Sequence, residues 1–224
     1  MKKTIFAFGS VAATTMLLSS FSSGDPVQTS NSNEHSSDEV TIGAQVWMTK
    51  NLDVSTFRNG DPIPQVQNKA AWVSAAEKGQ PAWCYYKNDS ANYAKYGKLF
   101  NWYAVTDSRG LAPVGYHIPT DAEWTILTDY LGGESAAGPK MKSANGWPEG
   151  YNGTNESGFN GLPGHYRGES GGFALPGGGN TSWWSSTNSV LKKYAYARYL
   201  GSESVVERGR WSKAMGFSVR CLKD

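Results

Sequence analysis

The sequence is poor in the residues that build metal and redox sites. It has two cysteines and three histidines, with neither a C-x-x-C pair nor an H-E-x-x-H motif. A zinc site needs several such ligands at close spacing, so we predict none. Calcium takes oxygen ligands, and Asn88, Ser90 and Asn92 alternate like the start of a calcium loop. Tyr93, however, stands where that loop needs glycine, and no late glutamate follows. We therefore expect no cofactor, with bound calcium as an alternative that no motif supports.

Charge of one sign is also lacking. The chain has 21 basic and 19 acidic residues, and its net charge is +2. Nucleic acids and membrane surfaces attract proteins through concentrated basic patches, so neither is an expected partner. No G-x-S-x-G elbow is present, and the glycines at 171–172 and 177–179 lack the lysine of a phosphate-binding loop. We therefore predict that the protein is not an enzyme.

One apolar run is present, between Ile5 and Leu18, after Lys2 and Lys3. It is shorter than the roughly 20 residues that span a membrane, and small residues follow it. This order is typical of a secretory signal peptide, which we place at residues 1–22; a retained membrane anchor is the alternative. The polar segment 23–39 is predicted to be a disordered spacer. We expect one exported domain, residues 40–224, without a transmembrane segment. Its location would be periplasmic, extracellular or on the cell surface.

Aromatic residues and glycine are abundant, with 9 Trp, 12 Tyr and 26 Gly. They indicate a core of rings wrapped by irregular loops. Thr120 and Glu123 form a capping box, and Asn68 is placed to cap another helix. Helices are predicted over 69–78, 97–107 and 120–131, a hairpin over 40–48, a long loop over 134–182, and strands over 182–186, 194–200, 204–208 and 216–222. The fold class is therefore α+β.

The two cysteines, Cys84 and Cys221, lie far apart in the chain. Two cysteines in an exported protein favour a disulfide, which would tie the end of the chain to its middle. The alternative is a pair of buried free thiols.

Three aromatic residues lie in loop-like sequence beside arginines. Tyr151, Tyr166 and Trp211 have polar neighbours, among them Arg167 and Arg210. Exposed rings of this kind stack on sugars or anchor a protein partner. We take these five residues as candidate ligand contacts, with partly buried loop anchors as the alternative.

Several stretches together resemble the Fibrobacter succinogenes major paralogous domain family (FISUMP). They are IGAQVWMTKNL (42–52), PAWCYYKND (81–89), YGKLFNWYAV (96–105), LAPVGYHIPTDAEWTILTDYLGG (111–133), NESGFNGLPG (155–164), WWSST (183–187) and GFSVRC (216–221). One departure is His165, which stands where the pattern has a second glycine. The resemblance implies a fold similar to C-type lectins and sulfatase-modifying factors, with two to three helices on a small antiparallel or mixed sheet and long irregular loops.

The resemblance implies no established activity. Sulfatase-modifying enzymes use a reactive cysteine pair near the C-terminus, whereas Cys221 stands alone there, and the sugar-site signatures of calcium-dependent lectins are absent. We expect a secreted or cell-surface binding module for a glycan or an envelope protein. One alternative is a structural or adhesive envelope subunit that self-assembles. An enzyme of unknown type, for which His117 would be the residue to test, is the third.

Overall fold

The computed structural model describes residues 38–175 and 177–224, which belong to one folded unit. The predicted signal peptide and most of the predicted spacer lie outside the described residues. The folded unit begins slightly earlier than expected, because Thr49 donates its backbone N–H to Asp38 and Glu39 opens the first strand. No helix within the described ranges is long and apolar enough to cross a membrane.

A four-stranded antiparallel sheet joins the two ends of this unit. The predicted hairpin is confirmed as β1 (Glu39–Ile42) and β2 (Gln45–Met48), and Trp47 is fully buried. The strand β9 (Leu222–Lys223) lies between β2 and β5 (Tyr116–His117). The C-terminal strand therefore closes the domain against its first hairpin.

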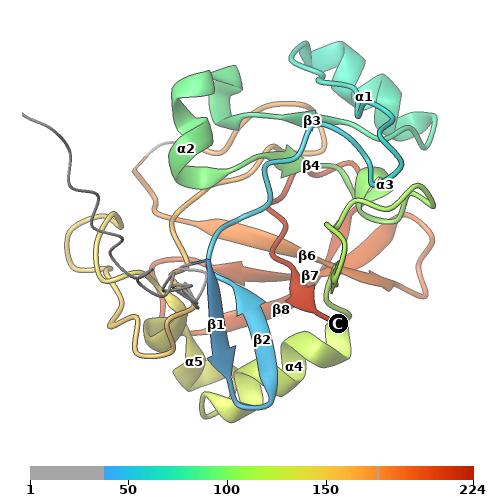
Figure 1. The fold of residues 1–224 in the computed structure, drawn as a ribbon. Coiled ribbons are helices and arrows are strands. Elements are labelled where there is room, and N and C mark those ends of the chain that lie inside the picture. Colours follow the sequence, from blue (N-terminus) through green and yellow to red (C-terminus); the bar gives the residue numbers. More distant parts are fainter. Residues whose placement is uncertain (1–37, 176) are drawn as a thin grey trace, which may run out of the picture. The chain divides into compact units, whose positions relative to one another are not determined.

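A three-stranded antiparallel sheet separates two hydrophobic clusters. It consists of β6 (Thr181–Asn188), β7 (Tyr194–Leu200) and β8 (Val206–Ser212) (Figure 1). Alternate residues point to opposite faces, so the neighbours Trp183 and Trp184 enter different clusters. Trp183 faces the helices α4 and α5, which Figure 1 shows on one side of the sheet. The third predicted strand was placed too early, at 204–208, because Gly209 and two arginines interrupt its apolar pattern.

Two of the predicted helices are confirmed with their caps. In α1 (Lys69–Glu77) the Asn68 side chain accepts from the Ala71 N–H at 3.0 Å. In α4 (Asp121–Tyr130) Thr120 and Glu123 form the capping box. These helices start where short-range hydrogen bonding dictates, which is why the sequence locates them well.

The prediction of a helix over 97–107 is wrong in its first half. Leu99–Phe100 form β4, which pairs with β3 (Trp83–Cys84), and Phe100 also exchanges backbone hydrogen bonds with Phe217. Helix α3 is limited to Trp102–Val105 and is capped by Asn101. Between β3 and β4 lie two 3₁₀ turns, Tyr86–Asn88 and Ser90–Asn92, and the single-turn helix α2 (Tyr93–Tyr96).

The segment predicted as one long loop contains a further helix, α5 (Glu134–Met141). Gly138 and Pro139 are poor helix formers, so the local sequence does not predict this helix. Gly138 lies against the backbone of Ser204, and a side chain there would collide with that carbonyl oxygen. A close approach of backbones, rather than helix propensity, therefore selects glycine at this position.

Buried cations hold the irregular segments in place. Lys98, Lys142, Arg167 and Arg220 are each at most 3% exposed, and each lies over an aromatic ring. Each also donates hydrogen bonds to backbone carbonyls of a distant segment. Charged donors of this kind make strong hydrogen bonds, so these side chains tie loops to the core.

Candidate functional site

The predicted ligand contacts do not form one site. Tyr166 and Trp211 are half-buried, and their rings meet at Phe217, with centroid distances of 6.1 and 5.9 Å. Tyr151 is 44% exposed and Arg210 is exposed. No hydrogen bond or ring contact among the described residues joins Tyr151 or Arg210 to the Tyr166–Trp211 pair. Trp211 and Arg210 are neighbours in β8 and point to opposite faces of the sheet.

The prediction that Arg167 contacts a ligand is wrong. Its side chain is 0% exposed and lies over the rings of Trp72 and Phe173, at 4.5 and 5.0 Å. Its guanidinium donates to the carbonyls of Val66, Gln67 and Gly171. All three nitrogens of the guanidinium therefore donate hydrogen bonds inside the protein. The sequence misled because arginine is seldom fully buried.

The predicted disulfide is absent from the structure, where Cys84 and Cys221 are free and buried. Cys84 packs with Trp72 and Leu99, whereas Cys221 belongs to a different hydrophobic cluster. Burial raises the pKa of the Cys84 thiol to about 11 and that of Cys221 to about 12. Thiols in this environment stay protonated and unreactive at neutral pH.

His165 explains the departure noted in the sequence. Its φ angle is +59°, a left-handed conformation that glycine adopts readily and other residues rarely do. The half-buried imidazole stacks on the Tyr86 ring at 4.3 Å, and its backbone N–H donates to the Asn180 carbonyl. The turn keeps the shape that a glycine would give, and the ring contact helps to hold His165 in it.

His117 lies between two carboxylates. Its Nδ1 is 2.8 Å from Asp224 Oδ1, and its Nε2 is 3.0 Å from Glu123 Oε1. Burial alone lowers the pKa of His117, but the hydrogen bonds to Asp224 and Glu123 outweigh burial and raise it above its usual value. This imidazolium links β5 to the capping box of α4 and to the chain end. These contacts join three parts of the fold, so His117 has a structural role.

We expect the His117 contact to make stability depend on pH. Because its pKa is raised in the folded state, its contribution is complete below the unfolded value of about 6.5 and is lost as pH rises through the folded value. The contribution should stay below about 1 kcal/mol, since the ring is more than one-third exposed. Urea titrations of the wild type and His117→Gln should differ most in mild acid. A difference that does not change with pH would contradict this expectation.

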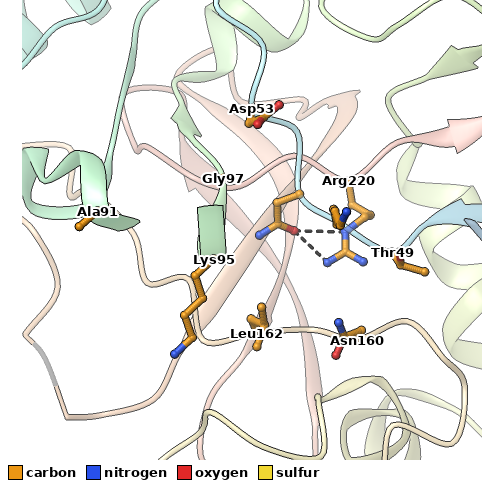
Figure 2. A pocket seen from close by; sticks show the side chains of 10 residues that line it. Thr49, Asp53, Ala91, Lys95, Gly97, Asn160, Leu162 and Arg220 are labelled. Atoms are coloured by element: carbon orange, nitrogen blue, oxygen red, sulfur yellow. Dashed lines mark hydrogen bonds between the residues drawn. The ribbon is translucent and has the colours of Figure 1, made fainter. Parts of the chain in front are cut away.

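The largest cavity among those described lies beside Asn51 and has a volume of about 620 Å³. Four separate segments line it: residues 49–53, 91–97, 160–162 and Arg220. Figure 2 shows Lys95 and Arg220 on opposite sides, with Leu162 and Asn160 along a third. We call it the Asn51 cavity. It has the size of a small-molecule site, and most of the residues that line it are polar.

Asn51 is the fixed point of this cavity. Its Oδ1 accepts hydrogen bonds from Trp183 Nε1 at 2.8 Å and from Arg220 Nη2 at 2.9 Å. Its Nδ2 donates to the Tyr96 carbonyl at 2.9 Å. Gly97 has a φ of +70°, and a Cβ there would lie 3.0 Å from Asn51 Cβ. This glycine lets the segment after α2 pack against Asn51.

Arg220 forms part of the base of the Asn51 cavity. Its side chain is 1% exposed, and its Nη1 donates to the carbonyls of Met48 and Phe159 at 3.0 and 2.6 Å. Burial lowers the pKa of Arg220, and no carboxylate contacts its guanidinium among the described residues. The positive charge of this guanidinium at the base of the cavity is therefore not neutralised by any described carboxylate in contact with it.

The groups near the opening can make polar contacts with a ligand. Lys95 is exposed, with its Nζ 5.0 Å from the Tyr96 ring, and Asp53 is exposed on another side. Lys50 is already paired with Asp38, at 2.6 Å. Asn160 has a φ of +56°, which presents its amide from a tight turn. The cavity thus offers ammonium, carboxylate and amide groups over a rigid base.

The cavity contains one carboxylate, and no histidine, cysteine or serine lines it. Hydrolysis of a glycosidic bond uses two carboxylates in most enzymes. That pair is not present in this lining, which holds only the Asp53 carboxylate. Within the described part of the chain, no group of three or more His, Cys, Asp or Glu side chains is placed to hold a metal ion.

Sequence reasoning missed this cavity. Its residues are far apart in the chain, and none of them is aromatic. A signal was nevertheless present, because Asn51, Gly97, Asn160, Leu162 and Arg220 all lie in the stretches that carry the family resemblance. Short polar residues within shared motifs were the informative feature, and exposed rings were not.

Comparison with family models supplies the identification. The model of the Fibrobacter succinogenes major domain matches residues 40–223. The chain belongs to this family. The match covers nearly all of the folded unit, including both clusters and every segment of the Asn51 cavity. Searches of curated proteins and of solved structures give no match.

Proposed function

We propose that this Fibrobacter succinogenes major domain is a non-catalytic glycan-binding module, exported to the cell surface or its surroundings, and that the Asn51 cavity holds the sugar. The observation that carries the proposal is the set of polar side chains that line the cavity above a base held by internal hydrogen bonds. Sugar hydroxyls both donate and accept hydrogen bonds, so they suit a mixture of amide, carboxylate and ammonium groups. Asn51 and Arg220 are fixed by internal hydrogen bonds, which limits the entropy lost when a ligand binds.

We also propose that the domain has a C-type-lectin-like fold. Three features support this: β9 pairs with the first hairpin, α1 and α4 are among its longest helices, and long irregular segments carry the cavity. In this proposal the first hairpin and β9 form the base of the fold, and the irregular segments that line the Asn51 cavity bind the ligand.

Loss of the Lys95 ammonium should weaken glycan binding about tenfold or more, since a hydrogen bond with a charged partner is worth about 1.5–3 kcal/mol; loss of the neutral Asn160 amide should weaken binding less, by roughly 0.5–1.5 kcal/mol. Lys95→Met removes an exposed ammonium, and Asn160→Gly removes an amide while keeping the left-handed backbone free of strain. The measurement is a glycan array with the secreted protein, followed by calorimetric titration of the strongest ligand with each variant.

Tyr166→Ala and Trp211→Ala are the matched controls. They alter the aromatic pair that the sequence suggested and leave the Asn51 cavity intact, so they should bind normally. Loss of binding in these variants alone would move the site to the aromatic pair. An array without ligands, together with oligomers that grow with concentration, would favour the self-assembling envelope subunit instead.

A further inference from the structure

A second cavity, of about 390 Å³, lies between α1 and the end of β8. Lys213 lines it and is only 9% exposed, with its Nζ 4.4 Å from the centroid of the Trp102 ring. Within residues 38–175 and 177–224 no protein acceptor or carboxylate contacts this ammonium, and its Nζ is not one of the fully buried polar atoms without a partner, so water reaches it. Burial lowers the pKa of Lys213, as expected for a cation without a compensating partner. We call this the Lys213 cavity.

A buried lysine without an acceptor in the protein is unusual for this fold, as two other lysines show. Lys98 and Lys142 are 2% and 3% exposed and also lie over tryptophan rings. The Lys98 ammonium donates to the Asp53 carbonyl and to Ser55 Oγ, and Lys142 donates to the Ser202 and Glu203 carbonyls. Lys98 and Lys142 therefore have hydrogen-bond acceptors within the protein. Lys213 has none among the described residues and lines a cavity instead.

The rest of the lining limits the kind of anion. Glu169 and Glu77 both line the cavity, and Glu169 is 3.2 Å from Lys193 Nζ. Lys193 balances Glu169, so Glu77 and Lys213 leave little net charge in the lining, which favours a monoanion over a dianion such as phosphate. The two carboxylates would accept hydrogen bonds from hydroxyl groups. Val73, Ala76 and Tyr103 add an apolar side against which a sugar ring can pack.

We propose that the Lys213 cavity binds a uronic acid, with the sugar carboxylate on the Lys213 ammonium and its hydroxyls on Glu77 and Glu169. The ligand would supply the acceptor that Lys213 lacks. This site shares no residue with the Asn51 cavity, so the two proposals can fail separately. Asn160→Gly should leave the Lys213 cavity unaffected.

The first test compares the melting temperatures of three variants without ligand. Lys213→Met keeps the stem over Trp102 and removes a charge that has no acceptor, so the melting temperature should rise. Lys98→Met and Lys142→Met leave carbonyls without a donor, so theirs should fall. If Lys213→Met lowers the melting temperature as the other two do, Lys213 is a structural cation and the proposal is wrong.

The second test titrates the protein with sodium glucuronate, with glucose as the neutral control, and follows backbone amide resonances. Glucuronate should shift amides near residues 77, 169 and 213, and Lys213→Met should weaken its affinity at least tenfold. Lys193→Met, which removes an exposed lysine of the same cavity, should weaken it less. The proposal is overturned if wild-type protein shows no glucuronate-dependent shifts there, if glucose gives the same shifts, or if Lys213→Met binds normally.

Discussion

Replacing Asp121 by asparagine is expected to lower the free energy of unfolding by about 3–5 kcal/mol. Asp121 is the first residue of α4 and is 8% exposed. Its two carboxylate oxygens lie 2.6 Å from Arg198 Nη1 and 2.6 Å from Arg208 Nη2. Arg198 is fully buried, so an asparagine of the same shape would leave its charge in the core without a counter-charge.

Chemical denaturation of the variant measures this loss, and two comparisons identify its cause. Asp61→Asn, which breaks an exposed pair with Arg109, should change stability much less. Adding Arg198→Met to Asp121→Asn should recover part of the loss, because it removes the uncompensated charge. A loss below 1 kcal/mol for Asp121→Asn would show that the cluster is not a buried ion pair in solution.

The same variant should change the response to acid. Burial alone raises the pKa of Asp121, but the hydrogen bonds from Arg208 and Arg198 outweigh it and lower the pKa. The contribution of a carboxylate with a lowered pKa is complete above its unfolded value of about 3.9 and is lost as pH falls through the folded value. Wild-type and variant stabilities should therefore converge in strong acid.

Replacing Arg220 by methionine is expected to cost about 3–5 kcal/mol as well. The guanidinium bridges Asn51 Oδ1, the Met48 carbonyl and the Phe159 carbonyl, and methionine would leave all three without this donor. The base of the Asn51 cavity would also loosen, so binding there should fall even under conditions where the variant is folded. Thermal melting and calorimetric titration measure the two effects.

Two further variants separate charge from geometry at this position. Arg220→Lys keeps a positive charge, but its compact ammonium cannot reproduce the planar fork, so an intermediate loss is expected. Arg210→Met removes an exposed arginine and should change stability by no more than about 0.5 kcal/mol. Equal effects of Arg220→Met and Arg210→Met would contradict the role given to Arg220.

The elements that the sequence predicted well are those determined by neighbouring residues. The capping box of α4, the Asn68 cap of α1 and the first hairpin each depend on contacts within a few residues. Elements determined by distant contacts were missed. Helix α5 contains Gly138 because the Ser204 backbone lies against it, and residues 99–100 are extended because they pair with β3 and Phe217.

The candidate site depends even more on contacts between residues that are distant in the chain. Asn51 and Arg220 are far apart in the chain, yet they share two hydrogen bonds, and no local pattern predicts such a pair. Arg167 was assigned to the surface because its charge normally demands water, whereas ring faces and three carbonyls replace the water here. Buried cations are therefore the feature of this fold that a sequence pattern misjudges most.

The most direct test of the proposed function is a crystal structure of the protein bound to the strongest ligand of the glycan array. The account predicts a sugar in the Asn51 cavity, with hydroxyl groups within hydrogen-bonding distance of the Asn160 amide and the Lys95 ammonium. A sugar bound on the Tyr166–Trp211 pair, with the Asn51 cavity holding only water, would contradict it.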